Sequence, residues 1–173
     1  MLKRFAVASL LIVIFVVSIV AYLYVQKTQS DLQKAASVSD FELIVRYGVG
    51  ARNELNTFNG TYTHDMIIDP PITTNLTLTI EEKWPTLQRI EEMDFFNLPS
   101  SFPVNPHMWV TPQVDYYIKV QNGSQTKEVS WNDNSLVESS IENSLDQLVI
   151  HIRGVIEQKL EYKALPTPNG GYL

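Results

Sequence analysis

The densest group of side chains able to do chemistry lies in the segment Thr61–Asp65, with Asp69 four residues further on. In a catalytic or metal site, His64 would act as general base or ligand, and Asp65 or Asp69 would orient it or share the metal. The β-branched composition favours a strand, and neighbouring strand residues point to opposite faces, so His64 and Asp65 would not converge. We therefore expect a solvated strand face. An exported hydrolase that uses His64, Asp65 and Asp69 is the alternative hypothesis.

The other titratable residues form no motif of known chemistry. His107 lies in a Pro-rich stretch and His151 in a helical one, far apart in the sequence. The pairs Glu81-Glu82 and Glu91-Glu92 diverge by about 100° on a helix, whereas glycosidase carboxylates face each other across a substrate. The chain has no cysteine, no Gly-x-Ser-x-Gly and no Gly-rich phosphate loop. We expect no catalytic, cofactor-binding or metal-binding residue.

Aromatic residues gather around a Pro-rich stretch at residues 99–112, and they suggest a groove for an apolar ligand or a partner peptide. Because small domains need their large side chains for the core, we expect most of them to be buried. A small apolar-ligand carrier is a second alternative function. The residues are Phe95, Phe96, Phe102, Trp109, Tyr116 and Tyr117.

Three Asn-x-Ser/Thr triplets are acceptors for N-glycosylation in a host that modifies exported proteins. They begin at Asn59, Asn75 and Asn122. Asn59-Gly60 and Asn122-Gly123 also read as type I′ hairpin turns, so turn chemistry alone accounts for these two pairs. Glycosylation of the three asparagines stays open at this point.

An apolar run at residues 5–25 predicts a transmembrane helix. It contains no charged residue, Pro or Gly, and as a helix it would cover roughly 30 Å, the thickness of the hydrocarbon core. Lys3 and Arg4 place residues 1–4 in the cytoplasm, so the rest of the chain lies outside it. A cleaved signal peptide is the rival reading, but its apolar region is normally shorter, and the candidate site at Ala21 is followed by Tyr22.

Charge argues against nucleic acid as a partner. The residues after the run carry all 19 acidic and 11 of the 13 basic side chains, a net charge of about −8, whereas phosphate binding needs clustered Lys and Arg. The expected contacts are the lipid bilayer, through residues 5–25, and a component of the cell envelope such as a protein.

The remaining sequence predicts a stalk at residues 26–39, one domain at 40–164 and an extended tail at 165–173. Strand periodicity appears at residues 41–47, 54–58, 61–68, 74–80, 114–121 and 125–131, with Asp69-Pro70-Pro71 ending the third run. Helical periodicity appears at about 81–93, beginning near Glu82 or Lys83 so that Pro85 lies in the first turn, and at 135–160. This order predicts an α+β two-layer domain with an antiparallel sheet of about five strands packed against two helices.

The residues Tyr47-Gly48-Val49-Gly50, Asn53–Thr63, Asp69-Pro70-Pro71 and Phe95–Pro99 resemble a family of small exported or membrane-anchored prokaryotic proteins with no assigned function. The resemblance covers most of residues 40–165 and implies a single exported domain. It implies no catalytic residue, cofactor or partner. The sequence thus indicates a single-pass membrane-anchored protein whose exported domain is a binding module of the cell envelope. We expect a non-enzyme rather than an enzyme.

Overall fold

The chain forms two compact units, a long helix and a domain that begins at Val38. The computed structural model describes the backbone of residues 2–172 and the side chains of residues 15–172. The helix, α1, runs without a break over Leu2–Ser37. The segment expected to be a stalk is therefore helical as far as Ser37.

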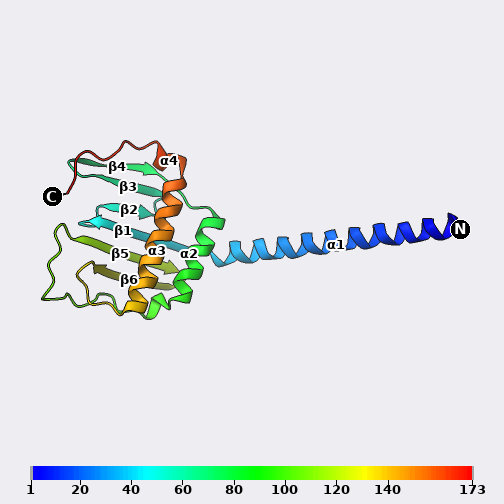
Figure 1. The fold of residues 1–173 in the computed structure, drawn as a ribbon, viewed down its shortest axis with the longest axis horizontal. Helices are drawn as coiled ribbons and strands as arrows, with labels where there is room; N and C mark the ends of the chain where they lie inside the picture. Colours follow the sequence, from blue (N-terminus) through cyan, green and yellow to red (C-terminus); the bar gives the residue numbers. More distant parts are fainter. Residues whose placement is uncertain (1, 173) are drawn as a thin grey trace. The chain divides into compact units, whose positions relative to one another are not determined.

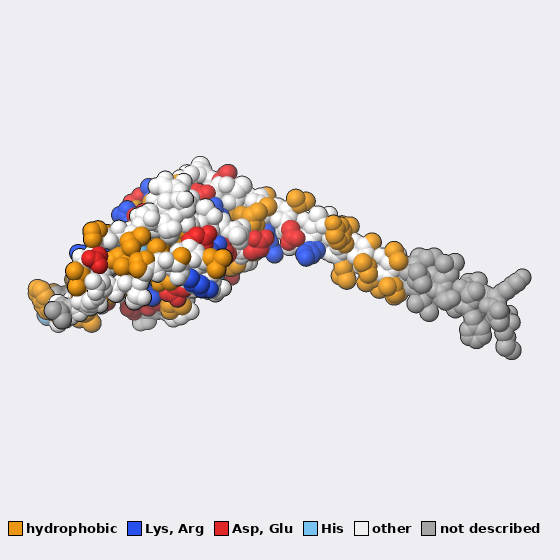
Figure 2. All heavy atoms as spheres, turned by 90° about the horizontal axis from the view of Figure 1, so that it is seen from above, with side chains coloured by type: hydrophobic (Ala, Val, Ile, Leu, Met, Phe, Trp, Pro, Cys, Tyr) orange, Lys and Arg blue, Asp and Glu red, His pale blue; other side chains and the backbone are white. Residues whose placement is uncertain are grey.

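From Phe15 onward, the apolar side chains of α1 are exposed around the helix. Figure 2 shows apolar side chains gathered on the helix next to the grey residues, with charged side chains further along. The large apolar side chains between Phe15 and Val25 are 43–72% exposed. Among the residues whose side chains are described, no helix is both long and apolar enough to cross a membrane. Residues 5–14 of the expected anchor lie outside them.

The domain contains a single antiparallel sheet with strand order β4-β3-β2-β1-β5-β6 (Figure 1). The sheet has six strands rather than the expected five or so. Their bounds are β1 Phe41–Val49, β2 Asn53–Asn56, β3 Thr61–Met66, β4 Asp69–Asn75, β5 Val114–Asn122 and β6 Gln125–Asn132.

The additional strand is β4, in the segment where prolines were expected to end pairing. It pairs with β3 only, at the edge of the sheet. Pro70 and Pro71 are tolerated because β4 is an edge strand and neither proline is paired with β3, where the register shifts between His64 and Met66. The strand expected at residues 74–80 is wrong in position, since β4 ends at Asn75 and a helix begins at Ile80.

Two helices cover one face of the sheet and enclose the core. They are α2 (Ile80–Glu92) and α3 (Ser139–Gln158), followed by the short α4 (Leu160–Lys163), while a 3-10 turn, η1 (Phe95–Asn97), follows α2. Phe41, Leu43 and Val45 alternate into the core with Ile118 and Val120, and Ile90, Leu145, Leu148 and Ile152 meet them from the helices. The α+β fold with helices on one face of an antiparallel sheet is confirmed.

Both main helices begin at other residues than expected. The backbone N–H of Thr79 donates to the Glu82 carboxylate at 2.8 Å, which closes the first turn of α2 and starts the helix at Ile80. Pro85 therefore lies inside α2 and removes one backbone donor there. The helix α3 starts at Ser139, because the Ser135 hydroxyl instead accepts from the Asn132 backbone at 3.0 Å, in the turn after β6.

The expected type I′ turns are also wrong. That turn needs positive φ at both central residues, but only Gly60 (+64°) and Gly123 (+57°) have it in these loops. The β5–β6 hairpin pairs Asn122 with Gln125, so Gly123 is its first central residue, the arrangement of a type II′ turn.

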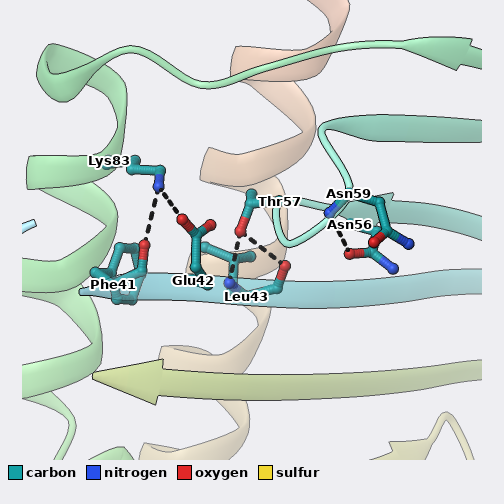
Figure 3. A network of polar contacts seen from close by, with 7 residues as sticks. All are labelled: Phe41, Glu42, Leu43, Asn56, Thr57, Asn59 and Lys83. Carbon is teal, nitrogen blue, oxygen red and sulfur yellow. Dashed lines mark hydrogen bonds and ion pairs between the residues drawn. The ribbon is translucent and has the colours of Figure 1, made fainter. Parts of the chain in front are cut away.

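A polar network fastens α2 to the start of β1 (Figure 3). The Lys83 ammonium donates to the Phe41 carbonyl at 3.0 Å and to the Glu42 carboxylate at 2.8 Å. In the turn after β2, the Thr57 hydroxyl donates to the Leu43 carbonyl at 3.1 Å and accepts from the Leu43 N–H at 2.8 Å. These bonds fix the end of the sheet at which the chain enters the domain.

Candidate functional site

A hollow of about 340 Å³ opens between the sheet and α3, and we call it the tyrosine groove. The strands β1 and β5 supply its floor, α3 supplies one wall and the C-terminal tail closes one end. Its size falls in the range of small-molecule sites. The lining residues are Tyr47, Gly48, Val49, Asn53, Asp65, Val114, Tyr116, Arg153 and Tyr172.

Hydroxyl groups at the base of the tyrosine groove form a chain. The Tyr62 hydroxyl donates to the Asn53 carbonyl oxygen at 3.3 Å, and lies 2.9 Å from the Tyr47 hydroxyl. Because Tyr62 has a single hydroxyl proton, Tyr47 is the donor of the shorter bond. The Asn53 carbonyl oxygen also accepts from the Asp65 N–H at 3.1 Å, so one amide ties β2 to β3.

These phenols and the nearby imidazole are uncharged at neutral pH. Burial raises the pKa of Tyr47 and of Tyr62, and in Tyr62 the neighbouring Tyr47 raises it further. Burial also lowers the pKa of His64, with Asp65 opposing the shift. A tyrosine with a raised pKa is a poor nucleophile but remains a hydrogen-bond donor and acceptor. The groove is therefore suited to recognition by hydrogen bonds and ring contacts.

Arg153 brings the positive charge of the tyrosine groove. Its guanidinium lies 5.3 Å from the centre of the Tyr47 ring, a cation–π distance, and 3.6 Å from the Glu157 carboxylate one turn along α3. Its side chain is 49% exposed, so several of its five donors remain open to solvent or to a ligand.

Tyr116 supplies a flat aromatic surface on the floor. Its ring stacks on Trp131 of β6 with 5.0 Å between ring centres and 14° between ring planes. Burial, and next to it the Asp146 charge, raises the pKa of Tyr116. A ring held in one orientation from behind presents a fixed face to a ligand in front.

The C-terminal tail occupies the end of the tyrosine groove near Asp65. The Tyr172 hydroxyl donates to the Asp65 carboxylate. The Asn169 side chain donates to Asp69 at 3.4 Å, and the Asn169 N–H donates to the Met66 carbonyl at 3.2 Å. The tail is therefore attached to the β3–β4 hairpin rather than free.

The structure gives different partners to the three residues of the hydrolase hypothesis. His64 contacts Tyr62 at 3.4 Å and the ring of Tyr162 at 5.5 Å. Asp65 binds Tyr172 and accepts from the Ile67 N–H at 3.0 Å, and Asp69 binds the tail. A β-bulge between His64 and Met66 interrupts the strand alternation, so Asp65 is buried beside Met66. The two carboxylates are thus engaged in holding the tail.

The aromatic residues near the Pro-rich loop divide into three groups. Phe95 is fully buried and Phe96 packs against the core. Phe102, Tyr116 and Tyr117 line a second hollow of about 390 Å³ with Trp131. Trp109 is 92% exposed at the loop. The expectation that most of the six pack in or against the core holds for Phe95, Phe96, Phe102 and Tyr116, and the alternative of a groove applies to the three that line the hollow.

His107 and His151 lie apart from the groove. His107 is exposed in the Pro-rich loop, where its N–H donates to the Asn105 side chain at 3.0 Å. His151 on α3 contacts the Thr86 hydroxyl of α2 at 3.3 Å. Within residues 15–172, no three His, Asp or Glu side chains are grouped so as to hold a metal ion.

No motif in the sequence marks the main groove residues, Tyr47, Asn53, Tyr116 and Arg153, or the buried Tyr62 behind them. Tyr47, Tyr62 and Tyr116 alternate with polar residues, which marks them only as core positions. The number of tyrosines at core positions could have indicated a polar site, because the hydroxyl of a buried tyrosine needs a hydrogen-bond partner. No family model matches the chain, and no curated protein matches it either.

Proposed function

We propose that this protein is a membrane-tethered, extracytoplasmic binding domain whose ligand site is the tyrosine groove. The partner is a component of the cell envelope that offers polar groups beside a flat face. Two features of the chain support this proposal, its exposed apolar helix and the chemistry of the groove.

The tether rests on residues 5–25. The described part of this run has apolar side chains exposed around the helix, an arrangement that costs free energy in water and is typical of a helix surrounded by lipid. Tyr22 and Tyr24 follow near the end of the run, where interfacial aromatic residues stand in membrane helices. Lys3 and Arg4 before the run favour an inside N-terminus.

The single observation that carries the binding function is the combination of Tyr47, Tyr116 and Arg153 around one hollow. Tyr116 offers a ring surface held in place by Trp131, and the buried Tyr47 holds Arg153 through a cation–π contact. The exposed Arg153 offers donors that its Glu157 contact leaves available. Rigid aromatic surfaces with a few placed polar groups are characteristic of binding sites.

The two alternatives have less support. The hydrolase hypothesis needs free carboxylates near His64, whereas Asp65 and Asp69 bind the tail. The apolar carrier needs an enclosed hydrophobic pocket, whereas the tyrosine groove is open and carries Arg153, Asn53 and Asp65 on its walls.

Site-specific photocrosslinking in native membranes tests the binding function. We would replace Tyr116 with p-benzoylphenylalanine, and as a matched control replace Thr126, an exposed residue of β6 on the sheet surface. We expect a discrete adduct from position 116, none from position 126, and a weaker adduct when Arg153→Gln is added. Equal adducts from both positions, or crosslinks to the same chain only, would contradict a specific site in the groove.

A topology measurement tests the tether. A reporter enzyme fused after Leu173 should be active outside the cytoplasm, and the protein should sediment with membranes until detergent is added. A cytosolic reporter, or a chain that stays in the supernatant with its first 25 residues intact, would overturn the proposed placement.

A further inference from the structure

The three acceptor triplets, separated in the sequence, lie at one end of the sheet. Phe41 at the start of β1 pairs with Asn122, and Ile44 three residues later pairs with Asn56, the last residue of β2. The β2–β3 loop containing Asn59 follows at that same end. On the next strand, Thr61 pairs with Asn75. Asn59, Asn75 and Asn122 therefore share the end at which the chain enters the domain.

Local contacts show how close two of these triplets are. The Leu76 N–H donates to the Gly60 carbonyl at 2.8 Å, and a Cβ on Gly60 would lie 3.0 Å from the Thr77 methyl group. The third triplet is fixed to the same end, because the Gly123 N–H donates to the Asp40 carbonyl at 3.2 Å.

The three asparagines differ from most others in their side-chain bonding. Within the described part of the chain, the side-chain amides of Asn59, Asn75 and Asn122 have no hydrogen-bond partner, and neither do the Thr61, Thr77 and Ser124 hydroxyls two residues later. Figure 3 shows that the backbone of Asn59 is held by Asn56, at 3.2 Å. By contrast, six of the other eight asparagines form side-chain hydrogen bonds: Asn53, Asn56, Asn97 and Asn169 donate from the amide, and Asn105 and Asn132 accept at the carbonyl oxygen.

Turn geometry does not account for this arrangement. The positive φ angles of Gly60 and Gly123 explain the glycines of two triplets. They do not explain a hydroxyl residue in the third position, and Asn75 precedes Leu76 rather than a glycine. Asn59 and Asn75 are exposed and Asn122 is half-buried, so a transferase can reach the first two most easily.

We propose that Asn59, Asn75 and Asn122 are N-glycosylated, which places a sugar coat on one end of the domain. This inference rests on the proposed export, since the modification occurs outside the cytoplasm. The donor is a lipid-linked oligosaccharide joined to its carrier lipid through phosphate. The asparagine Nδ2 forms a bond to the anomeric carbon, the bond from that carbon to the phosphate oxygen breaks, and the lipid phosphate leaves with the electron pair. The amide proton passes to a base of the transferase.

The coat has a physical consequence for the sheet. The strand β4 is an edge strand and Asn75 is its last residue, and unpaired strand edges invite pairing with other chains. A sugar on Asn75 blocks approach to that end of the edge. The tyrosine groove contains no acceptor triplet, so the coat leaves the proposed ligand site open.

Mass spectrometry of the protein purified from its own source tests the proposal. We expect an intact mass above the 19.7 kDa of the polypeptide and sugar-bearing peptides that contain Asn59, Asn75 or Asn122. The variants Thr61→Ala, Thr77→Ala and Ser124→Ala each keep the asparagine but should lose the sugar at their own site. Thr126→Ala, outside any triplet, should retain all three. Asn143, exposed but followed by Ser144-Leu145, should remain unmodified as an internal control.

The topology reporter separates the two possible failures. A domain found outside the cytoplasm whose mass equals that of the bare polypeptide would overturn the glycosylation proposal and leave the placement intact. A cytosolic domain would overturn both. Sugar on Asn143, or sugar that persists in the hydroxyl variants, would show that the triplets do not direct the modification.

Discussion

At the scale of single residues, the hydroxyl chain of the tyrosine groove predicts unequal effects of two similar substitutions. Tyr47→Phe removes one donor and should cost about 0.5–1.5 kcal/mol of unfolding free energy. Tyr62→Phe leaves the buried Tyr47 hydroxyl without its acceptor and removes one of the two donors to the Asn53 carbonyl oxygen, so it should cost more, about 1–3 kcal/mol. Urea unfolding of the two purified variants measures the difference.

The double variant Tyr47→Phe with Tyr62→Phe provides the control for this coupling. Removing both hydroxyls eliminates the bond and the unsatisfied groups together, so the double variant should cost less than the sum of the singles. Simple additivity would mean that the two hydroxyls do not interact, contrary to the distance between them.

Two half-buried histidines, His64 and His151, predict how the stability of the domain depends on pH. Burial lowers the pKa of His64, although the nearby Asp65 charge raises it in part. Burial also lowers the pKa of His151, and the charge of Arg89 lowers it further. Both groups therefore bind protons more readily in the unfolded chain, with its pKa of about 6.5. Stability should be full above that pH and should fall as the pH drops below it towards the folded-state pKa values.

Urea midpoints recorded between about pH 8 and pH 5 test this dependence. His64→Gln combined with His151→Gln should flatten the curve in this range, while His107→Gln in the exposed loop should leave it unchanged. A wild-type midpoint that rises on acidification through this range would contradict the assignment.

At the scale of elements, the Lys83 contacts predict a strong dependence of α2 docking on one ammonium group. Glu42 Oε2 is buried without a partner among the described residues, and Oε1 depends on Lys83. Lys83→Met should therefore lower the free energy of unfolding by about 2 kcal/mol, because it leaves a partly buried carboxylate without its ion-pair partner. Adding Glu42→Gln should recover part of the loss, as measured by thermal or urea unfolding.

The Lys119–Glu128 pair on the open face of the sheet is the matched control. Its atoms are 3.0 Å apart, but the two side chains are 32% and 50% exposed. Exposed pairs contribute little, so Lys119→Met should leave the free energy of unfolding nearly unchanged. If Lys119→Met destabilised the domain as much as Lys83→Met, burial of the ion pair could not explain the effect of Lys83→Met.

Periodicity in the sequence predicted the elements that have one buried face. Phe41, Leu43, Val45 and Tyr47 alternate in the sequence and are all buried in β1, and the α3 stripe was found in the same way. The predictions were wrong where a contact outside the periodic segment determined where a strand or helix begins or ends. Pro70 and Pro71 are acceptable only because β4 is an edge strand, and Ser135 leaves the helix because Asn132 binds it.

The tyrosine groove could not be predicted, because its members come from five separate parts of the chain. Tyr47 and Tyr116 meet through β1–β5 pairing, and Arg153 reaches them only because α3 crosses the sheet. Asp65 was predicted to lie on a solvated strand face, but a β-bulge buries it. No pattern in the sequence predicts that bulge. The tail that binds Asp65 and Asp69 contains mostly small residues and Pro, so it offered no periodicity to read.

At the scale of the whole molecule, the two units predict a separable domain. Among the residues whose side chains are described, those of the hydrophobic core of the domain all lie between Val38 and Leu165. A chain that starts at Val38 therefore loses none of the buried side chains that stabilise the domain. Because burial of apolar area supplies most of the folding free energy, the truncated chain and the full chain in detergent should unfold at the same urea midpoint to within about 0.5 kcal/mol of free energy.

The truncation should separate stability from placement. Without α1, the chain loses its only exposed continuous apolar helix among the described residues, so it should no longer sediment with membranes or liposomes, although it keeps the same midpoint. A second truncation that starts at Thr28 keeps the polar half of α1 and controls for helix length; it too should remain in the supernatant. If the Val38 chain unfolded at a clearly lower midpoint, α1 would have to stabilise the domain, and the division into two independent units would be wrong.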